Sequence, residues 1–372
     1  MRVTYLVRAD AEEIEARAEA LLLEQTVELP RTALRDRAVR ERVLGEVERI
    51  EPHEPGGYRV IIAQPLTTTA LDPAQLLNVL FGNSSLRPDV VLEDVDLPDQ
   101  TFGAFPGPNV GLEGWRVLTG VVDRPLVATA LKPMGLEPDA LAALCRTFAG
   151  AGLDVIKDDH GLADHLFCPF EQRVEACVRA IEASASETGR PALYVPNLIG
   201  TPARVFRQLR FARDAGVRAV MVSPMLVGLP LLHQLAAEAG GIAIMAHPAF
   251  GGALRIAEVV LLGKLFRWYG ADAVIFPHSG GRFTYSLETC RALAVEMRGP
   301  HPRVRPTLPV PAGGIRVDRV PELVRFYGRD CMLLIGGSLY EAGERIGERA
   351  RALADAVADA AARAAREAPE ET

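Results

Sequence analysis

The sequence lacks the features of a disulfide-stabilised or membrane-embedded protein. Its five cysteines include no C-x-x-C pair, and an odd number cannot form a complete set of disulfides. A reduced, cytoplasmic compartment is therefore the simplest expectation. No apolar run reaches the roughly 18 residues of a candidate transmembrane helix. Residues 1–7 resemble a strand rather than a signal peptide because Arg8 and Asp10 follow at once, so we expect a soluble protein.

The sequence also lacks an excess of basic charge. Lysine and arginine number 41 against 48 aspartates and glutamates, so the formal net charge at pH 7 is −7. The basic residues are spread along the chain, which argues against a nucleic-acid surface but leaves single anion sites open. With neither nucleic acid nor membrane as a partner, a small molecule is the expected ligand.

Residues 1–114 of the 372 show a mixed order of strand and helix patterns. Alternating apolar and polar residues predict strands, and apolar residues at helical spacing predict helices. The expected strands are 2–7, 26–29, 43–50, 58–63 and 90–97, the expected helices are 11–23 and 71–81, and the charged stretch 31–42 is expected to be a loop. This order indicates a small α+β domain of the ferredoxin-like kind. The proline- and glycine-rich stretch 102–114 is the expected boundary.

Residues 115–372 repeat a unit of strand, loop and helix. Apolar strands are expected at 126–131, 155–157, 193–195, 219–222, 242–246, 273–276, 307–310 and 332–335. The helices that follow begin near 138, 169, 202, 230, 257, 287, 320 and 340, and the last precedes an acidic tail expected to fray. Eight units in roughly 250 residues predict a (β/α)₈ barrel. An open doubly wound sheet is the alternative, which the lack of G-x-G-x-x-G after the first strand disfavours.

Polar and ionisable residues follow these strands, where catalytic groups of such barrels lie. Lys132 follows the first strand, and the second ends in Lys157-Asp158-Asp159-His160. Strands three to six are followed by Asn197, Ser223, His247 and His278. Lysines and carboxylates are costly to bury unless they pair, hold a metal or do chemistry. The sequence therefore predicts an active site at this end, with the two histidines as acid, base or hydrogen-bond donor.

Glycine pairs follow the last two strands, as Gly313-Gly314 and Gly336-Gly337. Glycine lets backbone N–H groups approach an anion closely. Many barrels bind phosphate after strands seven and eight, so phosphate or carboxylate is the expected ligand there. Ordinary turns remain the alternative for either pair alone. After strand six, Arg282 is either a clamp for another anionic group or a surface charge.

Six segments in chain order resemble the large subunit of ribulose-bisphosphate carboxylase (RuBisCO), and more closely the RuBisCO-like proteins. They are ALKPMGL (130–136), GLDVIKDDH (152–160), AHPAFGG (246–252), FPHSGGRF (276–283), PAGGI (311–315) and LIGGS (334–338). The resemblance covers almost the whole barrel. It implies a homodimer in which the N-terminal domain of one chain covers the barrel mouth of the other. Glu24 lies where the family has a glutamate that reaches the neighbouring subunit's site.

The resemblance also implies roles for individual residues. Lys132 matches the lysine that moves the enolisation proton, His247 and His278 match two active-site histidines, and the glycine pairs match phosphate-binding loops. Lys157 matches a lysine that CO₂ converts to a carbamate, which together with Asp159 would hold Mg²⁺. His160 stands in place of a glutamate ligand. Because Mg²⁺ prefers oxygen, this implies a weakened Mg²⁺ site, a different divalent ion, or Lys157 acting as a plain cation.

Four departures from the carboxylase weigh against CO₂ fixation. Met134 replaces a second lysine, Pro248 replaces an arginine that grips phosphate, and Ala312 replaces a serine. The loop after strand six, GGRFTYS, lacks the lysine that positions CO₂. We therefore expect no carboxylation of ribulose bisphosphate.

The residues that remain suit chemistry through an enolate, because a lysine of lowered pKa can move a proton beside a carbonyl. The leading hypothesis is a lyase or isomerase acting on a small keto-sugar phosphate or keto-sugar acid. An enolase or isomerase of methylthioribose salvage is one alternative within the family. A non-catalytic or regulatory RuBisCO-like protein is the other. Release of CO₂ would separate a decarboxylase from an isomerase.

Overall fold

The computed structural model describes residues 1–367 and divides into two compact units. The first comprises Met1–Pro106 and Phe250–Leu265, and the second comprises Gly107–Ala249 and Phe266–Thr372. The segment 250–265 thus belongs with the first unit, although it follows a barrel strand in the sequence. The domains expected at 1–114 and 115–372 stay a prediction. The acidic tail expected to fray lies outside the described residues, apart from Glu367 at the end of the last helix.

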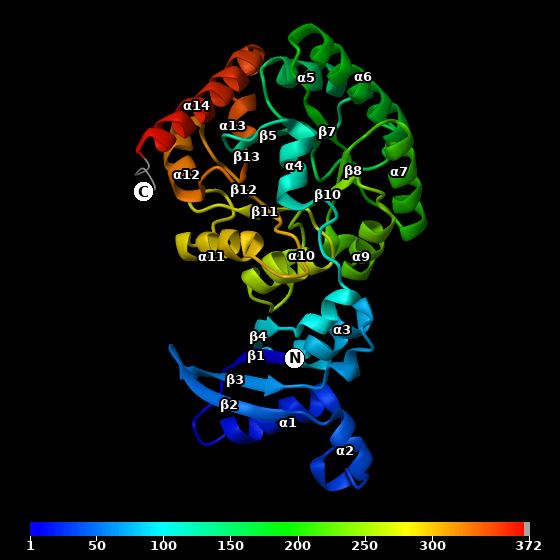
Figure 1. Ribbon diagram of the computed structural model, residues 1–372, viewed down its shortest axis with the longest axis vertical. Coiled ribbons are helices and arrows are strands. Elements are labelled where there is room, and N and C mark those ends of the chain that lie inside the picture. The colour runs from blue at the N-terminus through cyan, green and yellow to red at the C-terminus, as the bar shows by residue number, and fades with distance from the viewer. Residues whose placement is uncertain (368–372) are drawn as a thin grey trace. The chain divides into compact units, whose positions relative to one another are not determined.

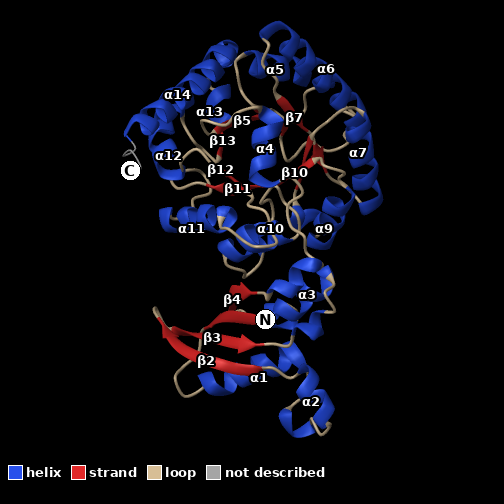
Figure 2. Cartoon of the chain, viewed as in Figure 1, coloured by secondary structure: helices blue, strands red, loops and turns tan. Residues whose placement is uncertain are grey.

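The first unit is built on a four-stranded antiparallel sheet in the order β2-β3-β1-β4 (Figures 1 and 2). Its elements are β1 (Arg2–Val7), α1 (Ile14–Thr26), α2 (Arg37–Val43), β2 (Glu46–His53), β3 (Gly57–Ala63), α3 (Pro73–Phe81) and β4 (Val90–Asp96). The order β-α-β-β-α-β of the main elements is the ferredoxin-like arrangement that the sequence predicts. Alternate residues of β1, Val3, Tyr5 and Val7, are fully buried because one face of the sheet forms the core.

Two local predictions in this unit are wrong. The strand expected at 26–29 does not form, because α1 continues to Thr26 and ends where Val27 and Glu28 donate their N–H groups to Leu23 O. The loop expected at 31–42 contains α2. Asp36 caps this helix, since its side chain accepts from the N–H groups of Ala38 and Val39.

The second unit is a (β/α)₈ barrel. One sheet has the order β13-β5-β6-β7 and the other β12-β11-β10-β9-β8, all parallel. The strands are β5 (Leu126–Leu131), β6 (Val155–Asp158), β7 (Leu193–Val195), β8 (Asn197–Leu198), β9 (Ala219–Val222), β10 (Ala243–Ala246), β11 (Ala273–Pro277), β12 (Leu308–Ala312) and β13 (Met332–Leu334). Pro196 separates β7 from β8, and β12 neighbours β13, so the two sheets close on each other. The eight predicted strands are confirmed.

Helices surround these strands (Figure 2). They are α5 (Pro138–Gly150), α6 (Phe170–Thr188), α7 (Pro202–Asp214), α8 (Pro224–Val227), α9 (Leu229–Glu238), α10 (Phe266–Trp268), α11 (Leu287–Arg298), α12 (Val320–Tyr327), α13 (Gly337–Tyr340) and α14 (Ile346–Glu367). The fifth predicted helix is largely π-helical, at Val259–Leu265. The last one starts at Ile346 rather than near 340, because Gly343 has a positive φ of 54° that interrupts it.

A further helix, α4 (Gly111–Thr119), was not predicted. Its two internal glycines and the prolines before it indicated a linker. Trp115 nevertheless lies fully buried in the core inside the barrel, so tertiary packing outweighs the weak local preference. No helix among residues 1–367 is long and apolar enough to cross a membrane.

Candidate active site

The interior of the barrel ends in a layer of polar side chains. Its apolar core includes Val155, Val195, Met221 and Met245, one from each of four neighbouring strands. Residues two positions apart on a strand face the same side. The next inward positions are therefore Lys157, Asn197, Ser223 and His247, which lie at the carboxyl ends of the strands. The alternation that directs apolar residues into the core thus directs these polar residues to the barrel mouth.

Lys132 and Asp159 form an ion pair at this mouth. Nζ of Lys132 lies 2.6 Å from Oδ1 of Asp159, and Nδ1 of His160 lies 3.4 Å from the same oxygen. Burial alone would raise the pKa of Asp159, but the hydrogen bonds from His160 and Lys132 and the charge of Lys157 outweigh it and lower that pKa. The Lys132 side chain is 32% exposed and can meet a ligand. The Tyr340 hydroxyl accepts the Lys132 N–H at 2.8 Å, which holds the end of β5 in place.

Lys157 lies next to this ion pair and is almost fully buried, with 2% of its surface exposed. Its Nζ donates to the backbone oxygen of Asp158 at 2.8 Å. Burial lowers its pKa from 10.5 to about 8, although the charge of Asp159 partly opposes the shift. Lys157 is therefore mainly an ammonium at pH 7, yet it loses its proton far more easily than a lysine in water.

His247 is a neutral hydrogen-bond donor in this arrangement. Burial, followed by the charge of Lys157, lowers its pKa well below the usual value. Nδ1 accepts the N–H of Ala249 at 3.1 Å, so the network assigns the ring proton to Nε2. The ring stacks on that of His160, with centroids 4.4 Å apart and an interplanar angle of 10°. The structure thus brings His247 together with the residues at the end of β6.

A buried network that sequence reasoning missed holds the end of β6. Both Asp158 and Arg173 are fully buried, and Arg173 Nε donates to Asp158 Oδ2 at 3.0 Å. Oδ1 of Asp158 accepts the Tyr194 hydroxyl at 2.8 Å, and Oδ2 also accepts the N–H of Asn197. Asp158 therefore joins β6 to the next barrel strand. This network holds in place the backbone that carries Lys157 and Asp159. The sequence signal was the first aspartate of the pair Asp158-Asp159, but nothing local identified its partners.

His278 lies at the end of β11, but its ring packs against α12 instead of the cluster around Lys157. Nδ1 is 2.7 Å from the Tyr327 hydroxyl, and the ring also contacts Phe326 edge-on. Burial, followed by the charge of Arg319, lowers its pKa to about 4, so the ring is neutral at pH 7. Its expected catalytic role stays a prediction.

The glycine pairs lie in three loops that are tied together. The N–H of Arg282 donates to Gly313 O at 3.0 Å, and the Ser338 hydroxyl donates to Ile315 O at 3.0 Å. Gly313 and Gly314 have φ values of 93° and 102°, which disfavour other residues. Gly336 lies against Lys132, since a Cβ there would meet Lys132 Cε at 3.8 Å. The glycine loops therefore adjoin the lysine cluster, while the Arg282 guanidinium lies 5.5 Å from the Phe283 ring.

In the first unit, Glu24 lines a cavity of about 210 Å³. The side-chain amide of Asn83 donates to Glu24 Oε1 at 2.9 Å and lines the same cavity. Sequence reasoning missed Asn83, because it lies in a short turn with no pattern beyond a preceding glycine. The pair presents one carboxylate and one amide, a set suited to a polar ligand.

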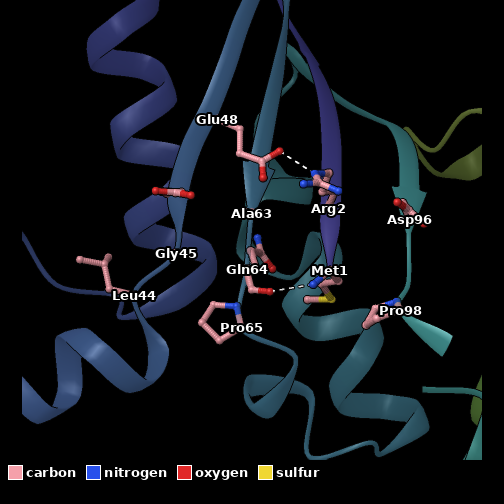
Figure 3. Close-up of a pocket in the computed structure, with 11 residues that line it drawn as sticks. Met1, Arg2, Leu44, Gly45, Glu48, Ala63, Gln64, Pro65, Asp96 and Pro98 are labelled. Atoms are coloured by element: carbon pink, nitrogen blue, oxygen red, sulfur yellow. Dashed lines mark hydrogen bonds and ion pairs between the residues drawn. The ribbon is translucent and has the colours of Figure 1, made fainter. Parts of the chain in front are cut away.

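A larger cavity of about 640 Å³ lies at one end of the sheet in the first unit, and none of the predicted site residues lines it (Figure 3). Its two cationic groups are already paired. The Met1 ammonium donates to Gln64 O at 2.9 Å, and Arg2 Nε donates to Glu48 Oε2 at 2.7 Å. Size alone therefore does not mark it as a reaction site, and the lysine cluster carries the chemistry.

The residues around Lys157 do not fit Mg²⁺ as they stand. Within residues 1–367, no three side chains of His, Cys, Asp and Glu converge on one point. Asp158 is committed to Arg173, Asp159 pairs with Lys132, and His160 offers nitrogen, whereas Mg²⁺ prefers oxygen ligands in near-octahedral geometry. The Mg²⁺ ion and the carbamate on Lys157 stay predictions.

Comparison with known proteins agrees with the barrel fold. Residues 112–274 match the family model "Ribulose bisphosphate carboxylase large chain, catalytic domain". The chain is 50% identical to "Ribulose bisphosphate carboxylase-like protein 1" of Rhodopseudomonas palustris over 92% of this chain and 94% of that one. It is 46% identical to "5-methylthioribulose-1-phosphate isomerase" of Rhodospirillum rubrum over 93% of both chains.

A solved structure is similar over nearly the whole length. The crystal structure of a RuBisCO-like protein from Rhodopseudomonas palustris matches with a TM-score of 0.90 and 47% identity, covering 96% of this chain and 97% of that one. Relatives of this chain are thus named both as RuBisCO-like proteins and as an enzyme. The chain belongs to the RuBisCO large-chain family, among its RuBisCO-like proteins.

Proposed function

We propose that this protein is an isomerase that moves a proton beside the carbonyl group of a keto-sugar phosphate, with 5-methylthioribulose 1-phosphate as the leading substrate. The observation that carries the proposal is the 2.6 Å contact between Lys132 Nζ and Asp159 Oδ1, directly beside the buried Lys157. Two amines and one carboxylate at a barrel mouth form an acid–base site. The name of the Rhodospirillum rubrum relative supports the choice of substrate.

Lys132 is the acid–base group of the proposal because it is partly exposed, whereas Lys157 is buried. After releasing its own proton to solvent, Lys132 takes the proton from the carbon beside the carbonyl, and the carbonyl oxygen accepts the electron pair. The Lys157 ammonium and the Nε2–H of His247 stabilise the enolate oxygen. The proton returns to the former carbonyl carbon while a hydroxyl proton passes between the two oxygens. The carbonyl moves by one carbon, and no atom is gained or lost.

The phosphate of the substrate binds at the glycine loops in this proposal. Gly313, Gly314 and Gly336 lie outside the regular strands, and within residues 1–367 their N–H groups make no backbone hydrogen bond. Free N–H donors in a glycine loop suit a phosphate. Pro248 stands where the carboxylase has a second phosphate grip, so a substrate with one phosphate fits better than a bisphosphate.

Proton exchange in D₂O tests the proposal. Wild-type protein should incorporate deuterium into 5-methylthioribulose 1-phosphate and form an isomer, both visible by NMR. Replacing Lys132 by Met should lower the exchange rate by about 10²- to 10⁴-fold, the usual contribution of an acid–base group. Lys264→Met is the matched control, because Lys264 pairs with Asp94 in the first unit and should leave the rate unchanged.

The same assay separates the alternatives. Release of CO₂ from a β-keto acid would favour a decarboxylase, and labelled CO₂ offered with ribulose bisphosphate should not be fixed. If the protein exchanges no proton with any keto-sugar phosphate, the enzyme proposal fails and the regulatory alternative takes its place.

A further inference from the structure

Two inward-facing residues of the barrel mouth have no part in the chemistry above. Asn197 and Ser223 follow Val195 and Met221 of the interior core by two positions, on strands between those of Lys157 and His247. Both side chains are about 99% buried. Polar groups at such positions are normally hydrogen-bonded, so an unpaired one needs an explanation.

The orientation of the Asn197 amide is determined by its contacts. Nδ2 donates to the backbone oxygens of His160 and Leu162, both at 3.0 Å. A flipped amide would set its oxygen against these two carbonyl oxygens, so the assignment of nitrogen and oxygen is secure. Oδ1 must therefore lie on the other side, and among residues 1–367 it has no hydrogen-bond partner.

The hydroxyl group of Ser223 lacks a hydrogen bond that its position in the chain would normally provide. It occupies the N-cap of α8, where serine usually accepts a backbone N–H, but its side chain makes no capping bond. Its Oγ has no partner at all within the described residues. A buried polar atom left unpaired destabilises the folded protein, so both residues are retained at the expense of stability.

We propose that Asn197 Oδ1 and Ser223 Oγ form a neutral subsite that binds the hydroxyl group next to the substrate carbonyl. The inference rests on the proposed function and adds the group that recognises the sugar beyond its phosphate. An amide oxygen accepts a hydrogen bond and repels a phosphate oxygen, so a hydroxyl is the fitting ligand. The neighbouring Lys157 ammonium disfavours a metal cation at the same point. Binding this hydroxyl would place the carbonyl beside Lys157 and His247.

The test compares two substrates, 5-methylthioribulose 1-phosphate and its 3-deoxy analogue, by kcat/KM for deuterium exchange. Wild-type protein should prefer the hydroxylated substrate by about tenfold, the scale of one hydrogen bond. Ser223→Ala and Asn197→Ala should each reduce this preference towards one. Because the preference is a ratio, it does not depend on how much of each variant is folded.

Ser184→Ala is the matched control. Ser184 is also buried with an unpaired hydroxyl, but it lies on α6 outside the barrel interior. Both serine variants should be as stable as wild type or more stable, whereas only Ser223→Ala should lose the preference. An unchanged preference in Ser223→Ala would overturn the subsite while leaving the isomerase intact. If wild-type protein exchanges deuterium with neither substrate, the proposed function fails, and the subsite fails with it.

Discussion

Lys157 combines deep burial with a positive charge, and its position is costly. Its pKa is about 8 in the folded protein and 10.5 in an exposed lysine. At pH 7 both the folded and the unfolded chain carry this proton, and the folded chain bears the full cost of about 3 kcal/mol. Between pH 8 and 10.5 the unfolded chain binds more protons than the folded one. The contribution of Lys157 to stability therefore becomes less unfavourable as the pH rises.

Replacing Lys157 by Met should stabilise the protein at pH 7 and abolish activity. The gain should be about 1–3 kcal/mol in the free energy of unfolding, because Met fills a similar volume without a buried charge. The difference from wild type should shrink as the pH approaches 10.5. Urea unfolding at pH 7 and at pH 9.5 measures both effects.

Lys132→Met serves as the contrast, since it removes the partner of Asp159 and should be destabilising. Only three lysines occur in the chain, Lys132, Lys157 and Lys264, so ¹³C labelling at lysine Cε gives a simple NMR spectrum. One signal should titrate near pH 8. A Lys157 signal that titrates near 10.5 would contradict the account of its burial.

At the scale of the elements, the loops after β11, β12 and β13 act as one support. Gly281 packs so closely that a Cβ there would lie 1.7 Å from Gly313 O. The adjacent N–H of Arg282 donates to the same oxygen. The geometry of the glycine loop after β12 therefore depends on a residue of the preceding loop.

Gly281→Ala should push these two loops apart. We expect a loss of about 1–3 kcal/mol in stability, the usual cost of overpacking, and a higher KM for the sugar phosphate. Steady-state kinetics and thermal unfolding measure the two changes. Gly103→Ala is the control, because a Cβ there meets nothing within 4 Å and should change neither quantity. An unchanged KM in Gly281→Ala would show that the loop contact does not support phosphate binding.

At the scale of the whole molecule, the candidate groups are divided between the two compact units. The lysine cluster belongs to the barrel, whereas Glu24 and its partner Asn83 belong to the first unit. The family resemblance predicts a homodimer in which Glu24 acts in the site of the neighbouring chain. A closed two-fold dimer would then contain two shared sites.

Subunit complementation tests this prediction. Glu24→Ala and Lys132→Met should each be inactive as homodimers. After unfolding and refolding together, half of the dimers should be mixed, with one intact site each, so activity should return to about a quarter of wild type. Glu28→Ala, beside the same cavity, is the control and should stay active. No recovery in demonstrably mixed dimers would contradict the shared site.

Much of the barrel was predictable because its signals are local. Short apolar strands alternate with helices that begin at proline, and the strand bounds agree within a few residues. The failures have different causes. The helix at 111–119 forms because Trp115 packs into the core, so contacts with distant residues outweigh the preference of the segment itself. The strand expected at 26–29 fails for a local reason, because α1 extends to Thr26 and the N–H groups of Val27 and Glu28 bond to Leu23 O.

The order of residues along each strand sets which side chains reach the barrel mouth, because alternation leads from core residues to Lys157, Asn197, Ser223 and His247. What each of these side chains can do there depends on the folded structure. Burial lowers the pKa of Lys157, the Ala249 N–H selects the tautomer of His247, and Asn197 is oriented by two distant carbonyls. Alternation is a property of neighbouring residues, whereas desolvation and hydrogen bonding depend on groups that only folding brings together.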